Sequence, residues 1–316
     1  MIFIYFIVFA ISFLVLVWAS KRLVFSLIKL AKFLGWKEFV VAFFTMALAS
    51  SLPNLSVGIS SALHKIPQLA FGDIIGGNII DLTLVMALAV LVSKRGLRLA
   101  SRTVQGSAFY TLLIALLPLI LILDKELSRI DGLLLILAFL FYSAWLFAKE
   151  DRFSKIYNKA KPMGLKAVFG HLFSIIGSII LLLLAAEGIV RSAIYFSTLL
   201  NLPLILIGIF IVGAGNALPE MFFCIQAAKK GKSWMVAGNL MGSVIILATL
   251  VLGTVALICP IKIVSFSPFM IGRFFLVVSA VFFLIFIRTG KRITKKEAIF
   301  LLMIYLAFIL VEIFFS

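Results

Sequence analysis

The fold is decided by a segment that the chain carries twice: Gly72-Asp73-Ile74-Ile75-Gly76-Gly77-Asn78-Ile79-Ile80-Asp81-Leu82-Thr83-Leu84-Val85 and, 166 residues later, Gly238-Asn239-Leu240-Met241-Gly242-Ser243-Val244-Ile245-Ile246-Leu247-Ala248-Thr249-Leu250-Val251. Upstream, the same shift aligns Leu52-Pro53 with Leu218-Pro219. An apolar composition produces chance matches of Ile and Leu, but it does not align prolines and glycines. We therefore interpret the two segments as copies of an internal repeat.

The composition around the repeat is that of a membrane protein. Apolar residues make up 64% of the 316 positions and charged residues 13%, and the mean hydropathy is +1.26. Soluble domains are about 45–50% apolar and about 25% charged, so this chain cannot cover a water-exposed surface with polar groups. A helix crosses the bilayer with about 20 apolar residues. Ten such stretches are present: 2–20, 38–62, 68–93, 104–123, 131–148, 168–190, 202–228, 234–259, 266–287 and 297–315.

Each copy of the repeat belongs to a set of five predicted spans. Because five is odd, the second set enters the membrane from the opposite face, which is the inverted repeat of many secondary transporters. We predict an all-α integral membrane protein whose ten transmembrane helices form two inverted five-helix repeats. The repeats are 1–148 and 168–316, joined by a basic cytoplasmic linker at 149–167. Two halves of nearly equal stability can exchange conformations and so expose a central site to either side.

The formal net charge of +17 is concentrated in alternate loops. Loops 21–37, 94–103, 149–167, 229–233 and 288–296 together hold 23 of the 29 Lys and Arg residues. Short loops rich in Lys and Arg stay in the cytoplasm, so the pattern predicts that both termini lie outside. The basic charge is thus interpreted as an orientation signal, not as a nucleic-acid-binding surface. We expect the protein to reside in the lipid bilayer of a prokaryotic cell membrane.

Candidate functional residues are the polar groups inside the apolar stretches. A charge at the bilayer centre costs about 2.5–3.5 kcal/mol on insertion scales, so each such group needs a partner, a cavity or a function. The aligned prolines free backbone carbonyls, which must line a protein-enclosed cavity because lipid cannot satisfy them. Carbonyls, hydroxyls, amides and carboxylates together suit a hard cation. The candidate ligands are Asp81 and Glu220, flanked by Asn54, Ser50, Ser51, Asn216 and Ser243.

Three other polar residues allow more than one interpretation. Asp73 lies two turns from Asp81 and is expected nearer the external interface; whether it takes part in ion access stays open. Glu187 precedes Arg191 by four residues, and we favour an ion pair on one helix face over a role in cation entry. We expect His64 to be a solvated loop residue without the neighbours of a metal site.

The repeated segments resemble the α-repeats of the sodium/calcium exchanger superfamily of cation antiporters. That family carries Gly-Thr-Ser-Leu-Pro-Glu in one helix and Gly-Asn-x-x-Gly-Ser-Asn in the next, once per half. The resemblance implies that the positions of Asn54, Asp81, Glu220 and Leu247 form the central cation sites. This chain departs from the pattern at Asn54, where Glu is usual, and at Leu247, where an acidic partner is expected. The resemblance therefore supports fold and mechanism better than calcium specificity.

The charge of the site bounds its substrates. Two ionised carboxylates carry a charge of −2, which one Ca²⁺, two Na⁺ or two protons would neutralise, and exchange needs such mutually exclusive occupancy. We expect a secondary active antiporter that exchanges Ca²⁺ for Na⁺ or H⁺ by alternating access. The alternatives are a monovalent-cation exchanger, a homologue with a degenerate ion site and, in another class, an inverted-repeat carrier of an organic metabolite. No nucleophile elbow, metalloprotease motif or phosphate loop is present, so we expect inorganic cations as ligands, no cofactor and no enzymatic activity.

Overall fold

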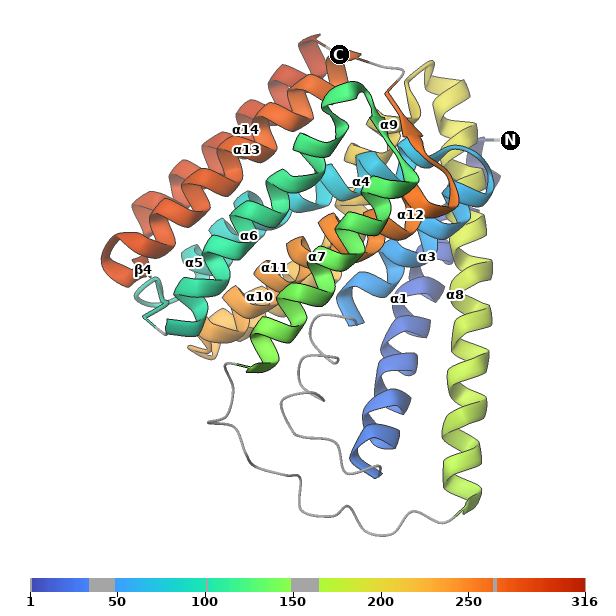
Figure 1. Ribbon diagram of the computed structural model, residues 1–316, viewed down its shortest axis with the longest axis horizontal. Helices are drawn as coiled ribbons and strands as arrows, with labels where there is room; N and C mark the ends of the chain where they lie inside the picture. The colour runs from blue at the N-terminus through green and yellow to red at the C-terminus, as the bar shows by residue number, and fades with distance from the viewer. Residues whose placement is uncertain (1, 34–48, 101, 149–164, 264–265, 316) are drawn as a thin grey trace.

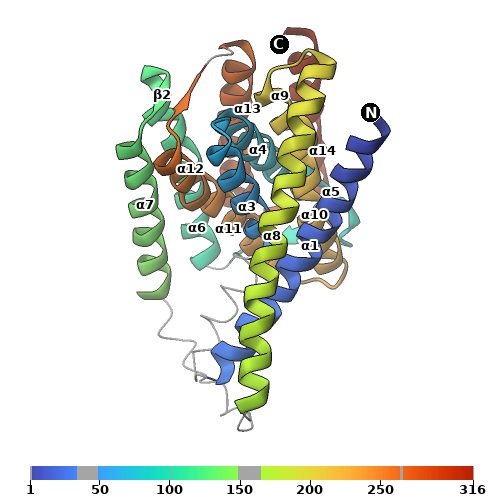
Figure 2. The same cartoon turned by 90° about the vertical axis from the view of Figure 1, so that its right-hand side faces the viewer.

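The computed structural model describes residues 2–33, 49–100, 102–148, 165–263 and 266–315. Helix accounts for 89% of these residues. Two long helices, α1 (Ile2–Phe33) and α8 (Leu165–Leu200), pack together along one side of the bundle (Figure 1 and Figure 2). The remaining helices of the first half are α3 (Ala49–Leu63), α4 (Pro67–Ile80), α5 (Met86–Val92), α6 (Arg102–Leu121) and α7 (Arg129–Ala148). Those of the second half are α9 (Leu204–Ile207), α10 (Ala214–Lys229), α11 (Ser233–Ile246), α12 (Leu252–Ile258), α13 (Phe266–Arg288) and α14 (Lys295–Phe315).

The helices have the length and surface of membrane spans. Among the described residues, nine helical stretches are long and apolar enough to cross a bilayer, and they correspond to nine of the ten predicted spans. The predicted span 38–62 is described only from Ala49 onward, as α3, and most of the predicted linker 149–167 also lies outside the described residues. Large apolar side chains cover the outside of the bundle; Phe141 is 82% exposed and Phe173 is 79% exposed. An apolar surface of this kind is favourable when it faces the lipid of a bilayer.

The two halves repeat one another in helix geometry. The helix α4, the π-helical turn η2 (Asp81–Val85) and α5 follow one another without a break, as do α11, the π-helical turn η5 (Leu247–Val251) and α12. Every boundary in the second series lies 166 residues after its counterpart in the first. In both turns a threonine, Thr83 or Thr249, donates its hydroxyl to the backbone carbonyl four residues earlier. The repeated segments of the sequence therefore have the same helix boundaries in both halves.

Four two-residue strands, which were not predicted, join the two halves. Strand β1 (Leu97–Arg98) pairs with β4 (Arg292–Ile293), and β2 (Glu126–Leu127) pairs with β3 (Ile261–Lys262), both antiparallel. Because β3 precedes α13 and β4 follows it, the two pairs lie at opposite ends of that helix, as Figure 1 shows for β4. Exchanging the halves would convert one pair into the other. One pair at each face is the arrangement that an inverted repeat requires.

The helix α4 crosses the second half in backbone contact. It packs on α9 and on the π-helical turn η4 (Gly208–Gly213) that follows it. A Cβ atom at Gly76 would lie 2.6 Å from the carbonyl oxygen of Ile209, and one at Gly72 would overlap the carbonyl of Ile205. Only glycine permits this approach, because any larger residue would place a Cβ atom against the facing backbone. The crossing sets the face of α4 that carries Asp73 against the second half.

Candidate functional site

Asp81 and Glu220 come from different halves and meet in the core of the bundle. Asp81 is the first residue of η2, while Glu220 follows Pro219 in α10, and these two elements pack together. Asp81 is fully buried and Glu220 is 5% exposed. The two carboxyl groups lie within electrostatic reach of each other. The crossing of the halves thus brings together the two acidic candidate ligands.

A hydroxyl from α11 completes this group. Ser243 is fully buried, and its Oγ donates to Oε1 of Glu220 over 2.9 Å. Ser243 and Glu220 also lie within hydrogen-bonding reach of the carboxyl group of Asp81, although no such contact meets conventional hydrogen-bond geometry among the described residues. A buried carboxylate with incomplete hydrogen bonding is costly, whereas a cation bound there would interact with its oxygens. The group of Asp81, Glu220 and Ser243 is called the acidic pair site below.

Asn54 and Asn216 do not belong to the acidic pair site; both contact Asp73 instead. Nδ2 of Asn54 lies 3.2 Å and 3.1 Å from the two carboxylate oxygens of Asp73. Nδ2 of Asn216 lies 3.0 Å and 3.1 Å from the same two oxygens. Asp73 is only 1% exposed and is therefore buried within the bundle; that it lies nearer the external interface than Asp81 stays a prediction. The close crossing of α4 with the second half is what buries it.

The two remaining candidates lie at the start of α3. Ser51 is 2% exposed and therefore buried. Ser50 lies on the same helical turn, but its side chain is outside the described part of the protein. The candidates thus fall into three places: the acidic pair site, the group formed by Asp73, Asn54 and Asn216 (the Asp73 group), and this turn of α3.

Leu247 occupies the place where the resemblance implies an acidic residue. It is 2% exposed and begins η5, as Asp81 begins η2. A Cβ atom at Gly77 would meet the Cδ1 atom of Leu247 at 3.8 Å, an ordinary packing distance. Gly77 is four residues before Asp81, which follows α4 without a break, and hence lies on the same helix face. An apolar side chain therefore borders the acidic pair site.

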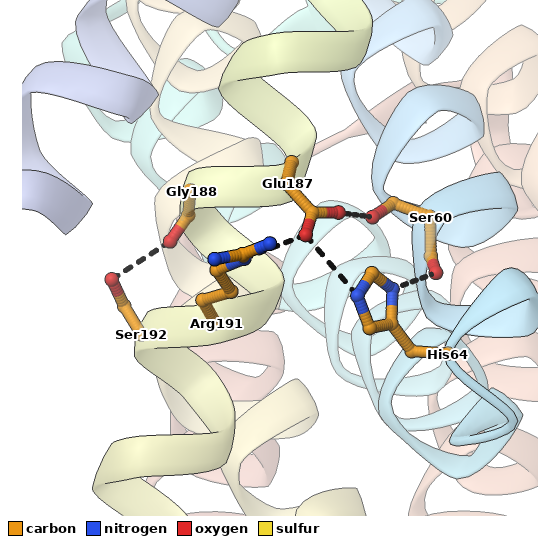
Figure 3. Close-up of polar contacts among 6 residues, drawn as sticks. All are labelled: Ser60, His64, Glu187, Gly188, Arg191 and Ser192. Atoms are coloured by element: carbon orange, nitrogen blue, oxygen red, sulfur yellow. Dashed lines mark hydrogen bonds and ion pairs between the residues drawn. The ribbon is translucent and has the colours of Figure 1, made fainter.

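Glu187 connects α8 to the end of α3 (Figure 3). Its Oε1 lies 2.7 Å from Nε of Arg191, which confirms the predicted ion pair. The same oxygen lies 3.1 Å from Nε2 of His64, and Ser60 donates to Oε2 over 3.1 Å. His64 lies in the turn that follows α3 and is exposed, as expected; its contact with Glu187 was not expected. We regard this cluster as a contact between helices, since its charges are largely paired within it.

Sequence reasoning underrated Asp73, although a comparison of the halves contains the signal. Counterpart positions are 166 residues apart, so Asn54 corresponds to Glu220 and Asp73 corresponds to Asn239. At this pair of positions each half thus carries one carboxylate and one carboxamide, but in exchanged order. A search for exchanged acid and amide positions in the repeat would have selected Asp73.

Comparison with known proteins agrees with this architecture. The family model described as sodium/calcium exchanger protein matches residues 4–148 and 170–314. The sodium/calcium exchanger MaX1 of Methanosarcina acetivorans is 26% identical, over 98% of this chain and 99% of its own length. Inner membrane protein YrbG of Escherichia coli is also 26% identical, over 78% of each chain.

Solved structures show the same fold. The sodium-calcium exchanger NCX_Mj has a TM-score of 0.66 to this chain at 24% identity, covering 98% of this chain and 99% of that one. The H⁺/Ca²⁺ exchanger CAX has a TM-score of 0.77 at 14% identity, covering 98% and 86%. Because the family model matches both halves over almost their whole length, this integral membrane chain belongs to the sodium/calcium exchanger protein family.

Proposed function

We propose that this protein is a secondary active antiporter that exchanges Ca²⁺ for Na⁺ or H⁺ by alternating access. The observation that carries the proposal is the meeting of Asp81 and Glu220, one from each half, in the buried core. Their combined charge of −2 is neutralised by one Ca²⁺ or by two monovalent cations. If the site changes its exposure only when neutralised, entry of one kind of ion requires the departure of the other.

The relatives support Ca²⁺ exchange and leave both coupling ions open. MaX1 is named a sodium/calcium exchanger, whereas the solved CAX structure is named an H⁺/Ca²⁺ exchanger. We propose that residues 1–148 and 168–316 act as the two moving repeats and that 149–167 links them. Leu247 favours a second candidate function, monovalent-cation exchange, because an apolar side chain there removes one ligand for a divalent ion.

Ion flux into proteoliposomes tests the proposed function. Purified protein in vesicles loaded with Na⁺ should accumulate Ca²⁺ against its gradient when the outside is free of Na⁺; an imposed pH gradient tests H⁺ coupling in the same way. Vesicles without gradients and protein-free vesicles are the controls. If no imposed gradient moves Ca²⁺ but Na⁺ exchanges for another monovalent cation, the second candidate function replaces the first. Absence of all cation exchange contradicts both.

The charge pattern makes the orientation testable. We propose that both termini lie outside and that the loop carrying Lys155, Lys159 and Lys161, which is outside the described residues, is cytoplasmic. In a background with both native cysteines replaced by Ala, Lys159→Cys should resist a membrane-impermeant maleimide in intact cells. The matched control is Lys262→Cys, on β3 in a predicted external loop, which should react. The reverse labelling pattern would overturn the orientation.

A further inference from the structure

The cluster around Glu187 connects α8, in the second half, to the C-terminal end of α3, in the first (Figure 3). Arg191 lies on α8 together with Glu187, so their ion pair holds the carboxylate in place without crossing between helices. The contacts that do cross come from Ser60, whose Oγ donates to Oε2 over 3.1 Å, and from His64, whose Nε2 lies 3.1 Å from Oε1. The polar link between the two helices therefore depends on these two residues.

Both ring nitrogens of His64 face oxygens that accept hydrogen bonds and do not donate them. Nδ1 lies 2.9 Å from the backbone carbonyl oxygen of Ser60, and Nε2 faces the carboxylate of Glu187 (Figure 3). A neutral imidazole has a single N–H, so its other nitrogen would present a lone pair to one of these oxygens. An imidazolium ion donates from both nitrogens. The arrangement therefore matches a ring that carries two protons.

The charges beside the ring fit this assignment. The guanidinium of Arg191 is charged at every physiological pH and donates from Nε to Oε1 over 2.7 Å, so Glu187 pairs as a carboxylate. The ring of His64 also lies against a carbonyl at the C-terminal end of α3, and the C-terminal end of a helix attracts positive charge. Lys65, the next residue, is the neighbouring positive charge on the same turn.

The other elements that pack on α3 bring few titratable groups to this end. Among them, α11, η5 and α12 contain none. Asp73 in α4 and Glu220 in α10 lie in the groups described above. The Lys and Arg residues of α1 lie in its C-terminal half, and near its N-terminus Tyr5 stacks on Tyr195 with ring centroids 4.0 Å apart. In the described part of the chain, the charged groups that face the ring are Glu187, Arg191 and Lys65.

Water reaches the cluster. The side chains of His64 and Glu187 are 35% and 32% exposed, so a proton can exchange with solvent. The turn lies at the same face as β3, since Nε2 of Gln68 donates to the carbonyl of Lys262 over 3.1 Å, and this is a predicted external loop. A histidine side chain gains or loses its second proton between about pH 5 and pH 8. The contact is therefore placed to follow the pH at that face.

We propose that Ser60, His64 and Glu187 form a regulatory proton site, which strengthens the contact between α3 and α8 when His64 carries two protons and weakens it when His64 carries one. The helix α3 also carries Ser51 and Asn54, so the site acts on an element that holds candidate ligands. Its proton is not the transported ion, because none of its three residues belongs to the acidic pair site. The inference rests on the proposed antiport only for its effect on transport.

The chain has two histidines, so the ring of His64 can be titrated directly. In a His171→Gln background, NMR of the one remaining imidazole should show a single protonation step between about pH 5 and pH 9. We expect the midpoint to move to lower pH in Glu187→Gln, because the amide lacks the charge that stabilises the imidazolium ion. Glu297→Gln, the same change at the start of α14, should leave the midpoint in place. An unchanged midpoint in Glu187→Gln would overturn the site.

Thermal unfolding tests whether protonation strengthens the contact. A double-mutant cycle of His64→Gln and Glu187→Gln should show a coupling at about pH 5.5 that is lost at about pH 8.5. The sign follows from linkage: the contact needs the protonated ring, so its stabilisation is complete at low pH and disappears as the ring loses its proton. A cycle of His171→Gln with Glu187→Gln is the control and should show no coupling at either pH. Equal coupling of His64 and Glu187 at both pH values would contradict the proposal.

The variant His64→Arg carries its positive charge at every pH and so separates the charge from the proton. In proteoliposomes, Ca²⁺ exchange by wild type should match His64→Arg at about pH 5.5 and His64→Gln at about pH 8.5. We expect the two variants to differ by about threefold, the size of a partly exposed ion pair. Competition by protons at the acidic pair site is common to all three proteins and cancels. Equal rates of the two variants would overturn the regulatory role. If wild type moves no Ca²⁺, the antiport proposal fails, whereas the titration and the coupling still decide the proton site.

Discussion

We expect Glu220→Gln and Asp81→Asn each to reduce Na⁺-driven Ca²⁺ uptake by about a hundredfold at low Ca²⁺, because each change removes half of the negative charge of the acidic pair site. Two unit charges 4 Å apart interact by about 4 kcal/mol at an effective dielectric constant of 20, and a hundredfold effect needs only about 2.8 kcal/mol. Each new amide keeps the approximate shape of the carboxylate. Folding should therefore remain largely intact, as thermal unfolding in detergent can verify.

The matched control is Glu297→Gln, the same change at the exposed start of α14. Glu297 accepts hydrogen bonds from the backbone N–H and the hydroxyl of Thr294, and Gln can take the same capping role. This variant should transport Ca²⁺ within about twofold of wild type, since it lies outside the proposed pathway. Undiminished exchange by both Glu220→Gln and Asp81→Asn, over a range of ion concentrations, would show that the site assignment is wrong.

We expect the second largest effect from Leu247→Asp, which should strengthen Ca²⁺ binding instead of weakening it. The new carboxylate would face Gly77, one turn before Asp81, and would raise the charge beside the acidic pair site from −2 to −3. We expect the apparent affinity for Ca²⁺ to increase by about tenfold, or 1.4 kcal/mol. We also expect more coupling cations to move per Ca²⁺, because an additional charge must be neutralised.

The same variant should lose stability when no cation is present. A buried carboxylate without a partner is strongly unfavourable, so the melting temperature of Leu247→Asp should fall in Ca²⁺-free buffer and recover when Ca²⁺ is added. Leu247→Asn is the matched control, because it introduces a polar group of similar shape without the charge. If the Asp and Asn variants show the same Ca²⁺ affinity and the same stoichiometry, Leu247 does not border the ion site.

The fold could be predicted because its determinants are local and repeated. Apolar stretches of spanning length fix the helices, and aligned prolines and glycines reveal the repeat. Gly72 and Gly76 permit the close approach of α4 to another helix, but the sequence does not show that its partner is the second half. The π-helical turns and the four strands could not be predicted, because nothing in their local composition distinguishes them from ordinary helix and loop.

The site was only partly predictable, because its contacts depend on where helices cross. Asp81 and Glu220 were selected by the cost of placing charge in a membrane, and that argument does not depend on the details of packing. Asp73 was selected by the same cost, but its partners come from α3 and α10, whose relative rotation the sequence does not reveal. The contact of His64 with Glu187 was missed for a related reason: His64 is an exposed turn residue, as predicted, but the sequence does not show that this turn lies beside α8.

The strand pairs β1–β4 and β2–β3 each take one strand from either half. Neither half can pair its own strands, because β1 lies at one face with β4, and β2 lies at the other with β3. A lone five-helix precursor with both loop strands would leave both edges open. A second copy of that precursor, inserted upside down, would close both. Each half therefore closes the open strand edges of the other, one at each end of the bundle.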